Sequence, residues 1–220
     1  MKLGVLFSGG KDSNYALFKS RKDAVCLISI ISKNKESYMF HVPNIHLVEY
    51  QAESMGLPLI KKFTEGEKEK ELEDLREAIE EAKKKYKIEG IVTGAVESVY
   101  QASRIQKICD ELGLWCFNPL WLKDQVELLN ELIKNKFEVI ISGVFAYPFN
   151  ESWLGRKIDE DVIGELVELK EKYKISISGE GGEYESSVLN SPMFKKKIKV
   201  VDSKKNWEGN SGVLEINKVE

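Results

Sequence analysis

The sequence predicts an α/β protein whose first half is a parallel sheet covered by helices and whose second half is a smaller α+β domain. In residues 1–121, apolar runs rich in β-branched residues alternate with segments of helical spacing. A glycine-rich turn at residues 8–13 connects the first such run to the first helical segment. The alternation ends after residue 121, so we expect two domains, residues 1–121 and 122–220.

Five strands and four helices are expected in the first half. The predicted strands are residues 3–7, 24–31, 57–62, 90–93 and 114–117. The predicted helices are residues 14–22, 45–55, 65–87 and 98–112, the last of them stopped by Gly113. Ligands of such sheets bind outside the carboxyl ends of the strands, which places the glycine-rich turn and Gly94 at one edge.

The second half has a different pattern. Helices are expected at residues 124–135 and 159–173, with a strand at residues 137–145 between them. Val200 and Val201 follow a run of lysines and are typical of an edge strand. These elements are too few and too irregular for a second parallel sheet, and they indicate a smaller α+β domain.

Composition narrows the class of protein. The 220 residues are 42% hydrophobic and 31% charged, with a net charge of −3, so no overall basic field favours nucleic acid. Cys26, Cys109 and Cys116 form no C-x-x-C pair and are expected to be buried free thiols rather than zinc ligands or disulfides. No apolar run reaches membrane-spanning length and none resembles a signal peptide, so we expect a cytoplasmic protein without a membrane partner.

The first glycine-rich turn has the chemistry of an anion site. It consists of Ser8, Gly9, Gly10, Lys11, Asp12 and Ser13. A strand, a glycine turn and a helix in succession aim backbone N–H groups at an anion, and Lys11 adds a positive charge. Asp12 is expected either to cap the helix or to hold a metal ion. The turn is not the common P-loop, because Asp12 follows Lys11 and Val5 stands where that motif has glycine.

The second cluster, residues 178–186, combines glycines with carboxylates. Three glycines within four residues allow close approach of a ligand, and Glu180, Glu183 and Glu185 surround Tyr184. Such a cluster repels phosphates unless a metal intervenes, but it attracts a cation. A glycine-rich hairpin turn with solvated glutamates is the alternative interpretation.

Residues 8–13 resemble the pyrophosphate loop of the ATP pyrophosphatase (PP-loop) superfamily, and nearly the whole chain resembles the diphthine–ammonia ligases, or diphthamide synthases. The resemblance also includes Ser37-Tyr38-Met39-Phe40, Gly94-Ala95 leading to Tyr100-Gln101 and Arg104, Asn118-Pro119-Leu120-Trp121, residues 179–185 and Pro192-Met193-Phe194-Lys195-Lys196. The glycine–glutamate motif, residues 179–185, is more specific to this family than residues 8–13, which the whole superfamily shares. The chain looks like the minimal archaeal form, because eukaryotic relatives carry further domains.

The resemblance implies a Rossmann-like domain of the adenine nucleotide alpha hydrolase-like (HUP) class that binds ATP and Mg²⁺. The implied reaction amidates diphthine on translation elongation factor 2 with ammonium through an acyl adenylate, giving diphthamide, AMP and pyrophosphate. The implied nucleotide contacts are Ser8, Gly9, Gly10, Lys11, Asp12, Ser13, Ile30 and Gly94, with Asp12 on the metal. The implied substrate contacts are Tyr100, Gln101, Glu180, Gly181, Gly182, Glu183, Tyr184 and Glu185.

Lys11 and Glu183 are the expected catalytic residues. Lys11 is expected to be exposed and to neutralise the leaving pyrophosphate. Glu183 is expected to accept a proton from ammonium, because Gly181 and Gly182 before it allow the closest approach. The alternative is that the glutamates only brace their loop through backbone hydrogen bonds. An aromatic face, Tyr184 or Tyr100, suits the trimethylammonium group of diphthine.

Two other functions stay open at this point, a tRNA-modifying enzyme of the same superfamily and a non-catalytic nucleotide-binding module. Thiolation of tRNA usually needs a cysteine pair or an iron–sulfur site, which the three spaced cysteines do not supply. A nucleotide sensor needs neither Lys11 nor a second carboxylate cluster. No glutaminase segment is recognised, so free ammonium is the expected nitrogen source, and a homo-oligomer is left open.

Overall fold

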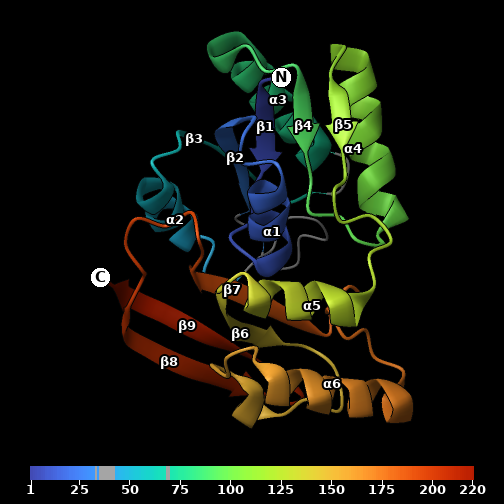
Figure 1. The fold of residues 1–220 in the computed structure, drawn as a ribbon, viewed down its shortest axis with the longest axis vertical. Helices are drawn as coiled ribbons and strands as arrows, with labels where there is room; N and C mark the ends of the chain where they lie inside the picture. Colours follow the sequence, from blue (N-terminus) through green and yellow to red (C-terminus); the bar gives the residue numbers. More distant parts are fainter. Residues whose placement is uncertain (33, 35–42, 68–69) are drawn as a thin grey trace. The chain divides into compact units, whose positions relative to one another are not determined.

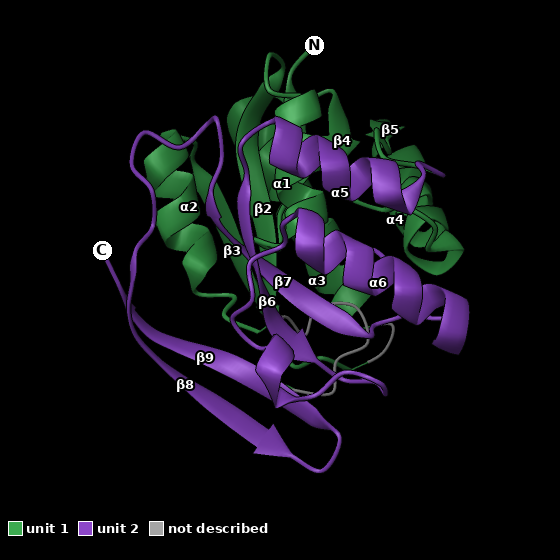
Figure 2. Ribbon diagram, turned by 60° about the horizontal axis from the view of Figure 1, so that its bottom comes forward, with its two compact units in different colours: residues 1–121 green, residues 122–220 purple. Residues whose placement is uncertain are grey.

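A computed structural model describes residues 1–32, 34, 43–67 and 70–220. They divide into two compact units, Met1–Trp121 and Leu122–Glu220, coloured separately in Figure 2. Each unit has a sheet of its own. The segment Ser37-Tyr38-Met39-Phe40, which carries part of the family resemblance, lies outside the described residues.

Unit 1 is the predicted α/β domain. Its five strands pair in parallel in the order β3-β2-β1-β4-β5 (Figure 1). The strands are β1 (Leu3–Leu6), β2 (Ala24–Ser32), β3 (Leu59–Thr64), β4 (Gly90–Val92) and β5 (Trp115–Phe117). The helices are α1 (Lys11–Lys19), α2 (Leu47–Met55), α3 (Lys70–Tyr86) and α4 (Val99–Leu112). The predicted parallel sheet is therefore confirmed.

Alternation along β2 explains how the sheet is buried on both faces. Cys26, Ile28 and Ile30 pack into a hydrophobic cluster that also contains residues of α3 and α4. Leu27 between them points to the opposite face and is fully buried as well. α3 contributes its apolar stripe, including Leu75 and Ile79, and exposes its charged side to water.

Local signals set several helix ends. Ser98 caps α4 by accepting a hydrogen bond from the Gln101 N–H at 3.3 Å, and Gly113 ends the helix with a left-handed φ of 62°. α1 begins at Lys11 rather than at Asn14, because the Gly10 carbonyl already accepts the Asn14 N–H at 3.1 Å. The helix therefore starts directly after the second glycine of the turn.

Unit 2 is the predicted α+β domain. Its antiparallel sheet has the order β7-β6-β9-β8. The strands are β6 (Glu138–Val144), β7 (Tyr184–Asn190), β8 (Val200–Glu208) and β9 (Ser211–Val219), and the helices are α5 (Gln125–Lys134), the 3-10 turn η1 (Glu151–Trp153) and α6 (Glu160–Tyr173). β8 lies at the edge of the sheet, as Val200 and Val201 predicted.

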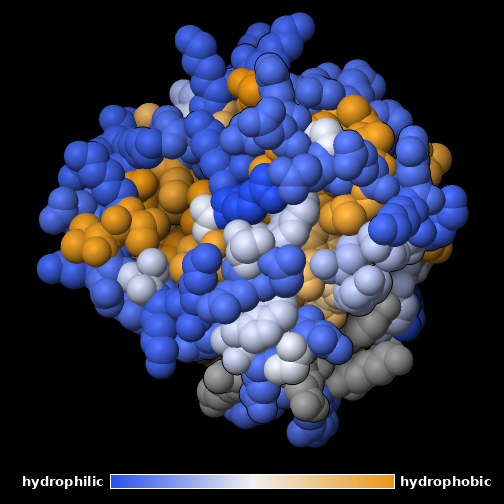
Figure 3. Space-filling view, turned by 90° about the horizontal axis from the view of Figure 1, so that it is seen from below, coloured by the Kyte–Doolittle hydropathy of each residue, from blue (hydrophilic) through white to orange (hydrophobic). Residues whose placement is uncertain are grey.

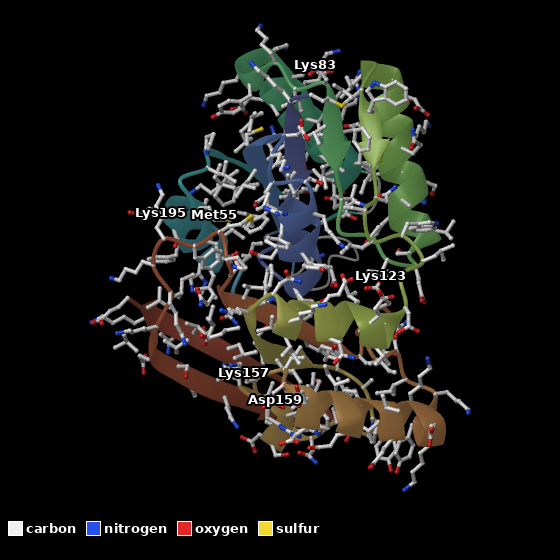
Figure 4. All side chains as sticks on the ribbon, viewed as in Figure 1. Met55, Lys83, Lys123, Lys157, Asp159 and Lys195 are labelled. Atoms are coloured by element: carbon white, nitrogen blue, oxygen red, sulfur yellow. The ribbon has the colours of Figure 1, made fainter. Side chains whose placement is uncertain are left out.

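A helix cap and ion pairs hold the helical segments of unit 2. Asp159 caps α6 by accepting the Val162 N–H at 3.0 Å, and Lys123 pairs with Glu127 at 3.1 Å and with Glu131 at 3.2 Å (Figure 4).

The surface drawn in Figure 3 is largely hydrophilic, with scattered apolar areas. Across the described ranges, no helix is long and apolar enough to cross a membrane.

The three cysteines are free thiols, as expected. Cys26 and Cys109 are buried, and Cys116 is half-buried. Burial raises the pKa of the Cys26 thiol to about 12, so it stays protonated at neutral pH. A protonated buried thiol behaves as a small apolar side chain, which agrees with a packing role.

Candidate functional site

The turn at residues 8–13 follows β1 and leads into α1, at the carboxyl edge of the parallel sheet. Gly9 has a φ of 82°, a conformation that side chains disfavour. The Ser13 hydroxyl accepts the Ser8 N–H at 3.3 Å and donates to the Gly10 carbonyl at 3.1 Å, and so joins the two ends of the turn. The local geometry is that of an anion-binding turn at a helix N-terminus.

Lys11 corrects one expectation, because its side chain is not exposed. Only 3% of the residue is accessible, and its Nζ donates to Asp12 Oδ2 at 2.7 Å. Lys11 is the first residue of α1 rather than part of a free loop, and its neighbours Gly10 and Ser13 are buried as well. The Lys11 ammonium is therefore buried in an ion pair with Asp12, at a helix N-terminus whose dipole also favours anions.

Asp12 does not cap α1, because Gly10 is the N-cap residue. One of its oxygens binds Lys11, and the other, Oδ1, is buried without a hydrogen-bond partner among the described residues. A buried carboxylate oxygen without a partner fits a cation. No group of three His, Cys, Asp or Glu side chains within the described ranges could hold a metal by itself. Mg²⁺ commonly takes one carboxylate together with substrate phosphates, so the donor set fits this metal.

Gly94 packs directly against the turn. A Cβ built on Gly94 would lie 2.8 Å from the Ser13 nitrogen and 2.9 Å from the Asp12 carbonyl carbon. β1 and β4 are neighbours in the sheet, so their carboxyl ends meet at this point. The expected proximity of Gly94 to the turn is therefore present, and any side chain there would displace the first turn of α1.

Ile30, Tyr100 and Gln101 lie in other parts of unit 1. Ile30 belongs to β2 and packs its side chain in the hydrophobic cluster. Tyr100 and Gln101 form the first turn of α4. The guanidinium of Arg104 lies 3.5 Å from the centre of the Tyr100 ring, so one face of this ring already carries a cation.

The glycine–glutamate loop is held by Glu183 itself. Glu183 Oε1 accepts the Ser176 N–H at 2.7 Å, and Oε2 accepts the Gly181 N–H at 2.9 Å. A Cβ on Gly181 would lie 2.7 Å from Glu183 Oε1, so only glycine leaves room for the carboxylate. This geometry supports the bracing role that was the alternative interpretation of the motif.

Two residues that the sequence analysis did not identify complete this loop. Gln125 Oε1, in the first turn of α5, accepts the Ser176 hydroxyl and the Ser178 N–H, each at 3.1 Å. The Ser176 hydroxyl in turn accepts the Glu180 N–H at 3.0 Å. Gln125 is more than 50 residues from the loop in the chain, and a single glutamine at a helix start gives no sequence signal of such a contact.

Tyr184 is not available as a surface aromatic. It is 2% exposed, its hydroxyl donates to the Ile177 carbonyl at 2.8 Å, and its ring packs against Phe149 at a centroid distance of 5.9 Å. Tyr184 begins β7, whose inward face is buried. Glu180 and Glu185 are half-buried and do not belong to the core.

Apart from Ile30, Tyr100 and Gln101, the predicted site residues fall into two groups. The turn at residues 8–13 and Gly94 are in contact within unit 1. Residues 180–185 form a separate, internally bonded loop of unit 2. Asn14 was also missed. Its amide donates to the Gly10 carbonyl at 3.1 Å, and the side chain is completely buried.

Known proteins match the chain along its length. The model of the diphthamide synthase N-terminal domain matches residues 1–116, and that of the diphthamide synthase C-terminal domain matches residues 124–220. The diphthine–ammonia ligase of Bos taurus is 34% identical over 225 residues, which is 92% of this chain and 84% of that protein. The human diphthine–ammonia ligase is 33% identical with the same coverage.

A longer relative and a solved structure are more distant. The diphthine–ammonia ligase of Saccharomyces cerevisiae is 32% identical over 88% of this chain, which covers 33% of the yeast protein. A structure described as a predicted subunit of tRNA methyltransferase from Methanocaldococcus jannaschii is 16% identical over 87% of this chain and 98% of that one, with a TM-score of 0.43, too remote to bear on function. The two domain matches and the relatives above 30% identity place the chain in the diphthamide synthase family, whose curated members named here are ligases that form a carbon–nitrogen bond.

Proposed function

We propose that this chain is a diphthine–ammonia ligase that amidates the diphthine of translation elongation factor 2. The reaction uses ATP and ammonium and yields diphthamide, AMP and pyrophosphate. Membership of the diphthamide synthase family over both domains supports the substrate class. The different chemistry of residues 8–13 and residues 178–186 supports separate nucleotide and substrate sites. We assign nucleotide binding to residues 1–121 and substrate binding mainly to residues 122–220, with Tyr100 and Gln101 as added substrate contacts.

The chemistry requires an activated acid, because a carboxylate is a poor electrophile. The diphthine carboxylate attacks the α-phosphorus of ATP, pyrophosphate leaves, and an acyl adenylate forms. Ammonia then attacks the carbonyl carbon and displaces AMP. Each step moves negative charge onto a phosphate, so stabilisation of that charge is the main demand on the protein.

The turn at residues 8–13 is suited to holding the leaving pyrophosphate. Its glycines place no Cβ near the backbone at the start of α1, and Lys11 adds a buried ammonium there, paired with Asp12 at 2.7 Å. Asp12 would hold Mg²⁺ through its unpartnered Oδ1, and the metal would supply further charge neutralisation when bound. Gly94, packed against the turn, is a further proposed nucleotide contact, and Ile30 is proposed as another although its side chain packs in the hydrophobic cluster.

The glycine–glutamate loop is suited to the cationic substrate. Glu183 is committed to two backbone N–H groups, which supports a role in shaping the loop. Glu180 and Glu185 lie in the same acidic loop and are proposed to face the trimethylammonium group, with Glu183 as the proposed acceptor of a proton from ammonium. Gly181 and Gly182 allow the backbone to approach the substrate.

The observation that carries the proposal is the turn itself, with a buried lysine, an unpartnered aspartate oxygen and Gly94 packed beneath it. The test is a reaction of the purified chain with diphthine-bearing elongation factor 2, ATP and ammonium. We expect AMP and pyrophosphate in equal amounts and amidation of the diphthine carboxylate by mass spectrometry. AMP formation with unmodified factor, or with tRNA instead, would favour the tRNA-modifying alternative. ATP binding without turnover would favour the non-catalytic module.

The nitrogen source is tested in the same assay. Ammonium salts should support amidation, and glutamine freed of ammonia should not, because no glutaminase segment was recognised in the sequence. Efficient use of purified glutamine by the isolated chain would contradict the proposal that ammonium is the direct substrate.

A further inference from the structure

A buried glutamine on α2 contacts the glycine turn. Gln51 is 0% exposed, and its Nε2 donates to the carbonyl of Gly9 at 3.0 Å, from a position 42 residues away in the chain. A Cβ built on Gly9 would lie 3.0 Å from Gln51 Oε1 and 3.2 Å from Val48 Cγ1. α2 is therefore packed closely against the turn, and Gln51 is its polar contact there.

The bonded carbonyl determines which way one peptide group faces. The Gly9 carbonyl and the Gly10 N–H belong to one planar trans peptide, so they point in opposite directions. Glycines on both sides would otherwise let this peptide rotate easily, because neither has a Cβ. A rotated peptide would present a carbonyl oxygen, which repels phosphate, in place of an N–H. A donor on the Gly9 carbonyl holds the orientation that suits an anion.

The next carbonyl is held independently. Gly10 O accepts the Asn14 N–H, the Asn14 side-chain amide and the Ser13 hydroxyl, each at 3.1 Å, all from α1. The Gly10 N–H itself has only a long bond of 3.4 Å to the Ser8 hydroxyl, which a charged phosphate oxygen can replace. Of the two glycine carbonyls, that of Gly9 is therefore the one whose orientation depends on another helix.

We propose that Gln51 is a positioning residue that locks the Gly9–Gly10 peptide with its N–H toward the pyrophosphate of ATP. The inference rests on the proposed nucleotide site. It predicts that loss of the Gln51 donor weakens ligands that carry a pyrophosphate and spares those that do not. AMP lacks the pyrophosphate group and serves as the comparison ligand.

The test is calorimetry of Gln51→Met, a variant of similar length without a donor, with pyrophosphate and with AMP in the presence of Mg²⁺. We expect the dissociation constant for pyrophosphate to rise about tenfold or more, with little change for AMP. Val48→Ala is the matched control, because it removes packing of α2 against the same turn but no hydrogen bond. It should lower the melting temperature and change the pyrophosphate affinity by less than about threefold.

Equal losses in the two variants, or unchanged pyrophosphate affinity in Gln51→Met, would overturn the role of Gln51. A wild-type chain that binds neither ATP nor pyrophosphate would overturn the nucleotide site as well, so the two failures are distinguishable. A measurement on the wild type does not depend on how well a variant folds: pyrophosphate should shift the Gly10 amide resonance in ¹⁵N–¹H spectra. An unmoved Gly10 resonance under saturating pyrophosphate would contradict the proposal.

Discussion

The two glycine-rich loops of this protein use their hydrogen bonds in opposite ways. In the turn at residues 8–13, side chains bind the glycine carbonyls, with Gln51 on Gly9 and Asn14 on Gly10. The N-cap residue Gly10 has no side chain, so no cap occupies the N–H groups of the first turn of α1. Side chains therefore engage both glycine carbonyls of the turn, while the first N–H groups of α1 have no side-chain cap.

The loop at residues 176–183 satisfies its own donors. Glu183 accepts the N–H groups of Ser176 and Gly181, Ser176 Oγ accepts that of Glu180, and Gln125 accepts that of Ser178. Backbone carbonyls accept the N–H groups of Gly179 and Gly182. With these donors occupied, the loop is poorly suited to bind a phosphate. The two glycine-rich loops thus differ in which backbone groups the side chains engage: glycine carbonyls in residues 8–13 and N–H groups in residues 176–183.

The largest expected effect comes from Lys11→Ala. Turnover should fall by roughly two to three orders of magnitude, because the charge opposite the leaving pyrophosphate is lost. The free energy of unfolding should also drop by about 1–2 kcal/mol, since the half-buried Asp12 carboxylate loses its partner. Lys19→Ala, at the exposed end of the same helix, is the control and should leave turnover unchanged. Unchanged turnover in Lys11→Ala would contradict its catalytic assignment.

Gly94→Ala tests whether the close packing of Gly94 against residues 8–13 is needed for ATP binding. The new methyl group would lie within 3 Å of the backbone of Asp12 and Ser13, which cannot move without shifting α1. We expect ATP affinity to fall at least tenfold, on the order of the 1–3 kcal/mol that overpacking costs. Gly113→Ala meets no atom within 4 Å but keeps a φ of 62°, so it should cost about 1 kcal/mol of stability and leave ATP binding intact. Similar ATP affinities in the two variants would show that Gly94 does not support the turn.

Glu183→Gln tests the second loop. The amide can accept only one of the two N–H groups that the carboxylate accepts, so we expect a loss of about 1–2 kcal/mol in unfolding free energy. Amide formation should fall with it, while ATP affinity measured by calorimetry stays near wild type. Glu180→Gln and Glu185→Gln should also reduce amide formation while ATP affinity stays near wild type.

The combination of results separates the roles of Glu183. A steep loss of amide formation in Glu183→Gln with an unchanged melting temperature would favour a general base over a brace. A loss of ATP affinity with the fold intact would instead indicate that the acidic loop holds magnesium and nucleotide.

The smallest effect is expected for Glu165→Gln. This substitution compares an ion-paired carboxylate at the surface with Glu183, which binds two backbone N–H groups. Glu165 forms two bonds to the Arg156 guanidinium, at 2.6 and 2.7 Å, and this hydrogen bonding lowers the pKa of Glu165. Because Glu165 is about half exposed, the pair should contribute no more than about 1 kcal/mol. Its contribution is present above the ordinary glutamate pKa and is lost as the pH falls through the lowered pKa.

Urea unfolding at two pH values checks this sign. Wild type should be more stable than Glu165→Gln near neutral pH, and the difference should disappear once the pH has fallen below the lowered pKa of Glu165. A difference that persists in acid would mean that packing rather than charge distinguishes the two proteins.

Local patterns in the sequence determined the fold class and the first loop. Alternation of apolar runs with helical segments predicted the parallel sheet, since strands buried on both faces must be apolar throughout. Ser98, Asp124 and Asp159 act as helix caps within three residues of the N–H groups they bind, so such ends are visible in the sequence. The anion turn was visible for the same reason, because its glycines, lysine and helix are adjacent in the chain.

Only the tertiary structure decided how the loop residues are used. Whether Lys11 is exposed depends on what packs around α1, and sequence spacing does not contain that information. Tyr184 was expected to offer an aromatic face to the substrate cation but begins a strand and is itself buried. Gln51 and Gln125 reach their loops from 42 and 53 residues away, and hydrogen bonds at such separation depend on how whole elements pack. The sequence thus determined which groups are present in each loop, and packing decided which of them stay accessible for chemistry.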